Sequence, residues 1–343
     1  MLVLVAGGAG LLGAAIAKAL LDEVDRLVVA DLFDDSGDGR LVKEFRTEPF
    51  EGHARASVER ADLTDDAAVE DLFARHRPAA VVNAARFDPF LRGAAPLMKG
   101  ARSSGTGLFV HLSDGALYPP AAEPGIAAAE SDPVDARGDF ALTSKLIEEQ
   151  RLEELGLPYV ALRLFDVVGP LFPPTRFPVE AFEAILSGEE VFLHDDRWRD
   201  YVHVADAVRA VLLALKRRPL GATLNVGGGL AVNPRTFLSL LARKAEREMN
   251  LTVLPPEGVG HPRIANLEAA GNRLGWAPFH SLDAICDAIV KARLAPAGGP
   301  PAERGPSAAP AWGLPAPVEP PKPVSRRELF DLIRRPFRGG EPR

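Results

Sequence analysis

Three glycines near the start of the chain have the spacing of a phosphate-binding turn. Gly7, Gly10 and Gly13 follow the apolar run Leu2–Ala6 and lead into a helical pattern. The first glycine permits a tight turn, the second lets the backbone approach a pyrophosphate, and the third lets the helix pack closely on the strand. The helix N-terminus then favours the phosphate charge. The pattern predicts a dinucleotide site with these contact residues: Gly7, Gly10, Leu11, Leu12 and Gly13.

An acidic residue follows at the end of the second apolar run. Asp31 lies 18 residues past Gly13, where a carboxylate can accept hydrogen bonds from the hydroxyls of the adenosine ribose. A carboxylate there would repel a 2′-phosphate, so Asp31 favours NAD over NADP as the cofactor. The alternative is that Asp31 only begins a solvated turn, since Asp34 and Asp35 follow.

Alternating apolar strands and helical patterns are expected to position these residues. Such an alternation is typical of a parallel sheet with helices on both faces. The expected strands are Leu2–Ala6, Arg26–Ala30, Ala54–Ala61, Ala80–Ala84, Leu108–Leu112 and Tyr159–Leu164. The expected helices are Leu11–Leu21, Asp65–Arg75, Leu91–Ser103 and Phe140–Leu155. The predicted fold class is α/β, a Rossmann-type doubly wound parallel sheet with a smaller, interleaved C-terminal substrate domain and a Pro-rich tail.

Changes in pattern and composition suggest four regions. Residues 1–165 are expected to form the NAD-binding domain, with later contributions near 200–227, and residues 166–291 mainly the substrate domain. Residues 292–324 are rich in Pro, Gly and Ala and are interpreted as a linker, because they cannot bury enough apolar surface to offset their ordering entropy. Residues 325–335 have the pattern of a short amphipathic helix.

Composition narrows the classes of function. The formal net charge of −7 argues against a nucleic-acid partner, which needs clustered Lys and Arg. The single cysteine, Cys286, excludes an intramolecular disulfide, and the scattered histidines suggest no metal site. No apolar run is long enough to span a bilayer, and no secretory signal precedes the first strand, so a cytoplasmic location is expected.

Eight motifs follow one another along the chain: the glycine turn, Asp62–Asp65, Val82–Ala85, Phe109–Ser113, Arg163–Pro170, Arg199–Val204, Leu224–Gly227 and Leu274–Pro278. Together they resemble the extended short-chain dehydrogenase/reductases, and within them the NAD-dependent epimerase/dehydratase group that acts on nucleotide sugars. The resemblance covers about residues 1–291. It implies that Asp62 and Leu63 contact adenine and that Ala84 and Ala85 line the cofactor.

The family's catalytic tyrosine is replaced in this chain. In the family, a tyrosine four residues before a lysine removes a proton from a substrate hydroxyl, while the lysine lowers the tyrosine pKa and holds the nicotinamide ribose. Lys145 fits the lysine, but Ala141 stands at the tyrosine position, next to Phe140. The usual Ser or Thr, four residues before Tyr118, is Asp114. The segment between Ala85 and the helix expected near Leu91 is also shortened.

Lys145 and Asp114 are therefore the expected catalytic candidates. The alternative is that Lys145 simply holds the ribose and Asp114 is solvated. Tyr118 and Tyr201 could replace the missing acid, although both occupy positions where the family uses a tyrosine for packing. His111 and His203 are expected to be structural.

The substrate side keeps two arginines that the resemblance assigns to a nucleotide diphosphate. Arg199 and Arg263 could clamp a pyrophosphate of a nucleotide-sugar-like ligand with charge-assisted hydrogen bonds. Asp166 stands where the family usually has asparagine, and its charge would disfavour an anionic nucleotide. The alternative is that both arginines are ordinary surface residues.

The C-terminal pattern predicts a docking element. Ser325 and Glu328 form a capping box, apolar residues follow on one helical face, and Pro336 ends the helix. So short a helix is marginal alone and is expected to dock on a protein partner or on a second copy of the chain. Two interpretations stay open: a divergent enzyme with impaired catalysis, and a non-catalytic NAD-binding subunit or sensor docked through residues 325–335.

Overall fold

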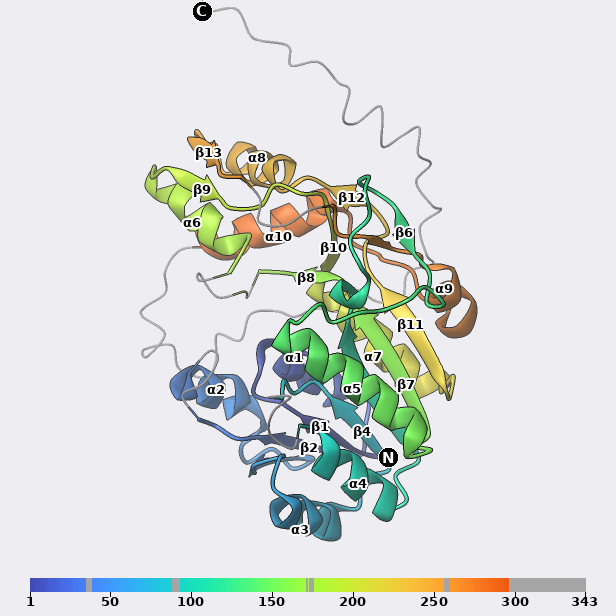
Figure 1. Cartoon of the computed structure of the whole chain (residues 1–343). Helices are drawn as coiled ribbons and strands as arrows, with labels where there is room; N and C mark the ends of the chain where they lie inside the picture. The colour runs from blue at the N-terminus through green and yellow to red at the C-terminus, as the bar shows by residue number, and fades with distance from the viewer. Residues whose placement is uncertain (35–38, 88–92, 171, 173–175, 256–259, 296–343) are drawn as a thin grey trace, which may run out of the picture. The chain divides into compact units, whose positions relative to one another are not determined.

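A computed structural model describes residues 1–34, 39–87, 93–170, 172, 176–255 and 260–295. Its centre is a seven-stranded parallel sheet in the order β11-β7-β5-β4-β1-β2-β3 (Figure 1). The strands are β1 (Leu2–Ala6), β2 (Arg26–Asp31), β3 (Ala56–Arg60), β4 (Ala80–Asn83), β5 (Leu108–Asp114), β7 (Tyr159–Leu164) and β11 (Ala222–Val226). The helices beside them are α1 (Leu11–Leu20), α2 (Arg40–Thr47), α3 (Asp66–His76), α4 (Ala95–Ser103), α5 (Phe140–Glu154), α7 (Val204–Arg217) and α9 (Glu268–Leu274).

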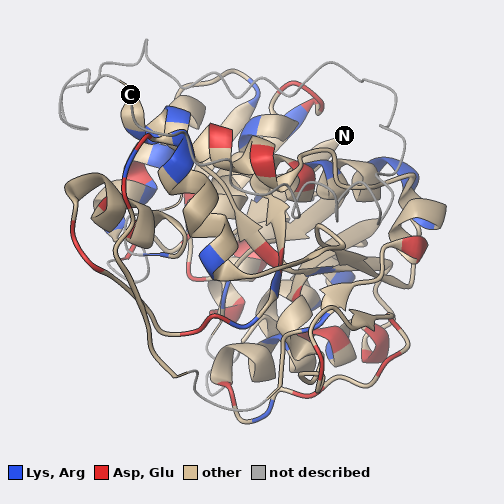
Figure 2. Cartoon of the chain, turned by 90° about the horizontal axis from the view of Figure 1, so that it is seen from above, with Lys and Arg blue, Asp and Glu red and all other residues tan. Residues whose placement is uncertain are grey.

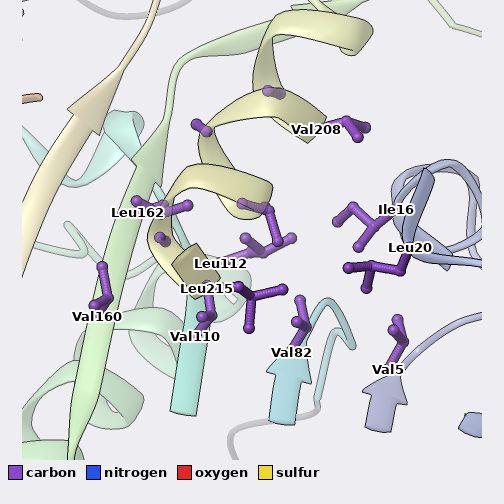
Figure 3. Close-up of a cluster of buried hydrophobic side chains, with 14 of the residues drawn as sticks. Val5, Ile16, Leu20, Val82, Val110, Leu112, Val160, Leu162, Val208 and Leu215 are labelled. Carbon is purple, nitrogen blue, oxygen red and sulfur yellow. The ribbon is translucent and has the colours of Figure 1, made fainter. Parts of the chain in front are cut away.

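Apolar side chains cover both faces of the sheet, because successive strand residues point to opposite sides. On one face, Val5 and Val110 pack against Ile16 of α1 and Val208 of α7 (Figure 3). The neighbouring strand residues, including Leu4 and Phe109, pack on the other face against α3, α4 and α5. This two-sided burial explains why the strands are almost continuously apolar.

Late segments of the chain return to this sheet. The edge strand β11 pairs in parallel with β7, with Leu224 beside Leu162. Helix α7 packs against α1 and follows β10 (Arg199–His203) directly. The sheet and the helices that cover it are therefore built from both the first 165 residues and the region near 200–227.

A second apolar cluster forms from the elements after Leu164. Phe182, Phe237 and Ile285 bring together α6 (Val179–Ser187), α8 (Pro234–Lys244) and α10 (Leu282–Leu294). Small sheets accompany them: β8 (Asp166–Val168) and β12 (Ala231–Val232) flank β10, β9 (Val191–Leu193) pairs with β13 (Leu251–Val253), and β6 (Ala127–Ala128) pairs with β14 (Ile264–Ala265). Short 3₁₀ turns, η1 (Glu48–Phe50) and η2 (Gly115–Leu117), complete the described elements.

The fold agrees with the predicted α/β class; most predicted boundaries shift by one or two residues, and three differences are larger. The helix expected from Leu91 begins at Ala95, with residues 88–92 outside the described ranges. Helix α2 had no predicted counterpart, because its buried side chains are the polar Lys43 and Thr47, whereas Leu41 and Phe45 are 80% and 53% exposed and form no core-facing stripe. Helix α10 extends to Leu294, beyond the expected start of the linker. The expected docking helix 325–335 lies outside the described residues.

Acidic and basic residues are interspersed over the helices in the view of Figure 2, in keeping with the moderate net charge. Among the residues that the structure describes, none of the helices combines the length and apolarity needed to cross a membrane.

Candidate functional site

The glycine turn has the conformation that a phosphate cradle requires. Gly7 has a φ of +72°, and a Cβ there would meet the Ala85 backbone at 2.6 Å. A Cβ at Gly13 would collide with the Gly7 carbonyl oxygen, whereas one at Gly10 meets that oxygen at 3.2 Å. Gly10 is the N-cap of α1 and has no side chain to cap the helix. The helix N-terminus is thus left for an anion, and the residues present fit a dinucleotide.

Asp31, the last residue of β2, lies beside this turn. Its Oδ2 accepts a hydrogen bond from the Ala9 N–H at 3.0 Å, and its Oδ1 accepts one from Leu32. The Lys43 ammonium, nearly buried, lies 4.0 Å from Asp31 and 2.5 Å from Asp34. Asp31 is therefore anchored at the loop rather than in a solvated turn, and Lys43 offsets part of its charge.

The other expected cofactor residues follow the carboxyl ends of the neighbouring strands. Asp62 and Leu63 come after β3, where Asp62 accepts hydrogen bonds from the Thr64 N–H and hydroxyl. Ala84 and Ala85 come after β4 and lie against Gly7. Because carboxyl ends of parallel strands share one edge of a sheet, these residues lie along the edge where dinucleotides bind in such folds.

Lys145 lies on α5 and reaches the same loop. Its Nζ donates to the Ala85 carbonyl at 3.1 Å and lies 3.3 Å from Glu148 Oε2. Ser144 donates its hydroxyl to the other Glu148 oxygen at 2.8 Å. The charged partner of Lys145 is therefore Glu148, which the sequence interpretation missed in favour of Asp114. The i, i+3 spacing of Lys145 and Glu148 was the available signal.

Asp114 ends β5 and begins the η2 turn. Its Oδ1 accepts a hydrogen bond from the Ala116 N–H at 2.8 Å. Burial raises the pKa of Asp114, against the opposing effects of that hydrogen bond and of the charges of Lys145 and Arg86. Asp114 is consequently neither fully solvated nor directly paired with Lys145.

The three tyrosines of the chain all lie among the described residues. The contacts of each one are with residues other than Lys145. Tyr118 donates to Asn225 at 2.8 Å and accepts from Arg163 at 2.7 Å. Tyr159 donates to Glu153. Tyr201 packs edge-on against Phe237 in the second cluster, and burial raises its pKa. In the described structure, none of the three phenol groups is bonded to Lys145, whose partners are Ala85 and Glu148.

The two histidines expected to be structural are both buried. His111 lies between Asn83, whose amide is 3.3 Å from Nδ1, and Glu148, whose Oε2 is 3.5 Å from Nε2. Burial and the charge of Lys145 lower the pKa of His111 well below its usual value. His203 accepts from the Ala205 N–H and stacks on His280. Burial, reinforced by His280, lowers the pKa of His203 to about 4.

The expected substrate residues are already paired with acids. Arg199 donates to Asp195 at 2.8 Å and lies 3.7 Å from Asp166 on the adjoining strand β8. Arg263 donates to Asp132 at 2.6 Å and to the Ala127 carbonyl. Burial raises the pKa of Asp166, with Arg199 opposing and Asp114 adding to the shift.

Asp195 is held by two guanidinium groups. Arg197 bonds both of its oxygens, at 2.9 and 2.7 Å, and Arg199 bonds the second. Burial opposes the charged form, but the hydrogen bonds from Arg197 and the charge of Arg199 lower the pKa of Asp195 to about 2. In the described ranges, no group of three or more His, Cys, Asp or Glu side chains is arranged to hold a metal ion.

The parallel sheet, the glycine turn and the lysine on α5 define a Rossmann-type dinucleotide-binding protein of the short-chain dehydrogenase/reductase class. Residues 3–227 match the NAD dependent epimerase/dehydratase family, and the chain belongs to that family. This confirms the family resemblance and NAD as the family's cofactor.

Relatives and solved structures of this family span most of the chain. A UDP-glucose 4-epimerase of Rhizobium leguminosarum bv. trifolii is 29% identical over 82% of this chain and 94% of the relative. A dTDP-glucose 4,6-dehydratase of Actinoplanes sp. is 26% identical over 81% and 93%. The UDP-glucose 4-epimerase of Thermus thermophilus, solved with NAD, has a TM-score of 0.72 at 26% identity and covers 86% of this chain and 100% of that one. The Thermotoga maritima UDP-glucose 4-epimerase, solved with UDP-glucose, has a TM-score of 0.75 at 24% identity, covering 85% and 98%.

Proposed function

We propose that this protein binds NAD on a nucleotide-sugar epimerase scaffold and is impaired in the family's catalysis. The observation that carries the proposal is the surroundings of Lys145. Its ammonium contacts Glu148 and the Ala85 carbonyl, while Ala141 stands one helical turn earlier, where the family places its tyrosine. We expect the lysine to hold the nicotinamide ribose, while among the described residues no phenol is bonded to it that it could activate.

The cofactor would be held at the edge formed by the glycine turn, Asp31 and Lys145. When bound, NAD supplies a hydride acceptor. The family's reaction also needs a base that removes the hydroxyl proton of the substrate as hydride leaves. The described tyrosines are committed elsewhere, so this proton transfer lacks its usual group.

The pairing of the substrate-side arginines supports the same proposal. A nucleotide diphosphate would have to compete with Asp195 for Arg199 and with Asp132 for Arg263. The arginine would lose a short hydrogen bond to a carboxylate and gain one to a phosphate, so the net change in free energy would be small. We therefore expect UDP- and dTDP-sugars to bind weakly.

Turnover of nucleotide sugars is expected to be very low. Positioned acid–base catalysis contributes about 10²–10⁴-fold, so the conversion rate of UDP-glucose or dTDP-glucose should fall below that of a tyrosine-containing relative by about that factor. The measurement is product formation, with cofactor reduction followed at the nicotinamide absorbance, and the Rhizobium epimerase serves as the control.

Turnover comparable with the Rhizobium enzyme would contradict the proposal. That result would favour a second candidate function. In it, the protein is a divergent enzyme that uses Asp114, whose burial favours the protonated form. Loss of the observed turnover in Asp114→Asn would then assign the proton transfer to this carboxyl group.

If turnover is instead low, as proposed, Ala141→Tyr, which returns a phenol to the family position, is expected to recover at most trace activity.

We further propose that residues 325–335 dock a protein partner or a second copy of the chain. Their sequence pairs an apolar face (Leu329, Leu332 and Ile333) with flanking arginines, which would suit an acidic rim around a groove. Burial of each aliphatic side chain would contribute roughly 1.5–3 kcal/mol, offset in part by the cost of ordering the helix.

Deletion of residues 325–343 is expected to dissociate the complex while leaving NAD affinity and thermal stability nearly unchanged. Native mass measurement of the full and truncated chains, each purified from the source cell, gives the readout. An unchanged mass with the same co-purifying chains would show that the segment does not dock.

A further inference from the structure

Glu148 is a buried carboxylate beside Lys145. Its side chain on α5 is only 3% exposed, and its two oxygens have different neighbours. Oε1 accepts the Ser144 hydroxyl at 2.8 Å, and Oε2 lies 3.3 Å from Lys145 Nζ and 3.5 Å from His111 Nε2. Burying such a charge is costly unless a cation compensates it.

Lys145 supplies that compensating charge. The other two neighbours are a neutral hydroxyl and an imidazole that burial keeps neutral by lowering its pKa. In His111, the Asn83 amide faces Nδ1, which leaves Nε2 as the nitrogen that carries the proton and faces the carboxylate. Glu148 and Lys145 therefore form one ion pair with no net charge.

This pair lies next to the position expected for the nicotinamide. Lys145 is bonded to the Ala85 carbonyl, and the Ala85 backbone lies 2.6 Å from the place that a Cβ of Gly7 would take. The lysine thus touches the wall of the glycine turn. Its placement at the nicotinamide ribose rests on the proposed function.

We propose that Glu148 sets the preference of this site for oxidised over reduced cofactor. The nicotinamide ring of NAD⁺ carries a positive charge, and that of NADH is neutral. An uncompensated lysine beside the ring repels the oxidised form only. The negative charge of Glu148 offsets the positive charge of Lys145, so NAD⁺ binds without repulsion between the lysine and the nicotinamide ring.

The size of the effect follows from Coulomb's law. At the effective dielectric of protein interiors, two unit charges several ångströms apart interact strongly enough to change a ratio of affinities by about tenfold. The hydrogen bonds of the lysine to the ribose are the same in both redox forms, so they cancel from the ratio of the two dissociation constants.

The test uses Glu148→Gln in the full chain, freed of bound nucleotide and titrated with NAD⁺ and with NADH by calorimetry. The amide keeps the shape and the acceptor for Ser144 but removes the charge. The ratio Kd(NAD⁺)/Kd(NADH) is expected to rise by about tenfold. Glu153→Gln is the matched control: it removes the same charge from an exposed position on the same helix and should leave the ratio unchanged.

A double-mutant cycle with Lys145→Met assigns the effect to the pair. At a pH high enough to keep the unpaired Glu148 carboxylate charged, Lys145→Met alone should lower the ratio, and the double variant should return it to the wild-type value, because both charges are then gone. If Glu148→Gln does not fold, the Lys145→Met ratio at that pH decides the question, and a value at or above wild type overturns the proposal.

Equal loss of both affinities in Glu148→Gln, at a constant ratio, would overturn the proposal and make Glu148 a structural residue. The proposed function would still stand, because the wild-type protein would still bind NAD. Failure of the wild-type protein to bind either nucleotide would instead overturn the proposed function itself.

Discussion

Gly10→Asp is expected to weaken NAD binding by about 1,000-fold, since placing a like charge beside a phosphate costs several kcal/mol. A side chain at this position should affect binding of the cofactor and leave the fold intact. A Cβ at Gly10 meets only the Gly7 carbonyl oxygen, at 3.2 Å, whereas one at Gly13 would collide with it. The added carboxylate stands at the N-terminus of α1, where the pyrophosphate is expected.

Calorimetric titration with NAD measures the effect, and thermal unfolding without ligand reports whether the fold is kept. Gly271→Asp is the matched control, because it adds the same charge to the exposed face of α9, where the nearest atom to a Cβ is 3.8 Å away. Unchanged NAD affinity in Gly10→Asp would show that the turn does not hold the pyrophosphate.

Arg163→Met is expected to lower the free energy of unfolding by about 3–5 kcal/mol, as is typical when one partner of a buried ion pair is removed. Arg163 is 6% exposed and bonds Glu149 with two nitrogens, at 3.0 and 2.7 Å. It also donates to the Tyr118 hydroxyl at 2.7 Å. The substitution leaves the Glu149 carboxylate without its cationic partner and removes a hydrogen-bond donor from the Tyr118 hydroxyl.

Urea unfolding compares this variant with Arg75→Met. Arg75 also pairs with two acids, Glu59 and Asp71, but its side chain is 44% exposed. Solvent screens such a pair, so a loss below about 1 kcal/mol is expected. Similar losses in the two variants would mean that burial does not set the strength of the Arg163 pair.

The sequence was most informative where one residue type is required by the backbone or by burial. Gly7, with its positive φ, and the apolar run of β1 identify the turn without knowledge of the rest of the chain. Asp139 caps α5 by accepting from the Leu142 N–H, and the helix begins at Phe140 as predicted. These features depend on neighbours within a few residues.

The missed features depend on contacts between distant segments or on weak local patterns. Glu148 becomes a partner of His111 only when α5 packs on β5, which brings together residues 37 positions apart. Asp132 reaches Arg263 across 131 positions. Asp195 was closer, four residues before Arg199, but the Asp195–Arg199 spacing alone does not distinguish an internal pair from two groups that await a ligand.

The strand order also has a consequence for how the chain folds. The face of the sheet that carries α1 is closed by α7, and the edge beside β7 is closed by β11, both from beyond residue 203. During synthesis, the first 165 residues therefore expose apolar strand surface until Val226 has left the ribosome. A chain that ends at Phe165 would lack both covers, and its apolar strand surface would stay open to solvent.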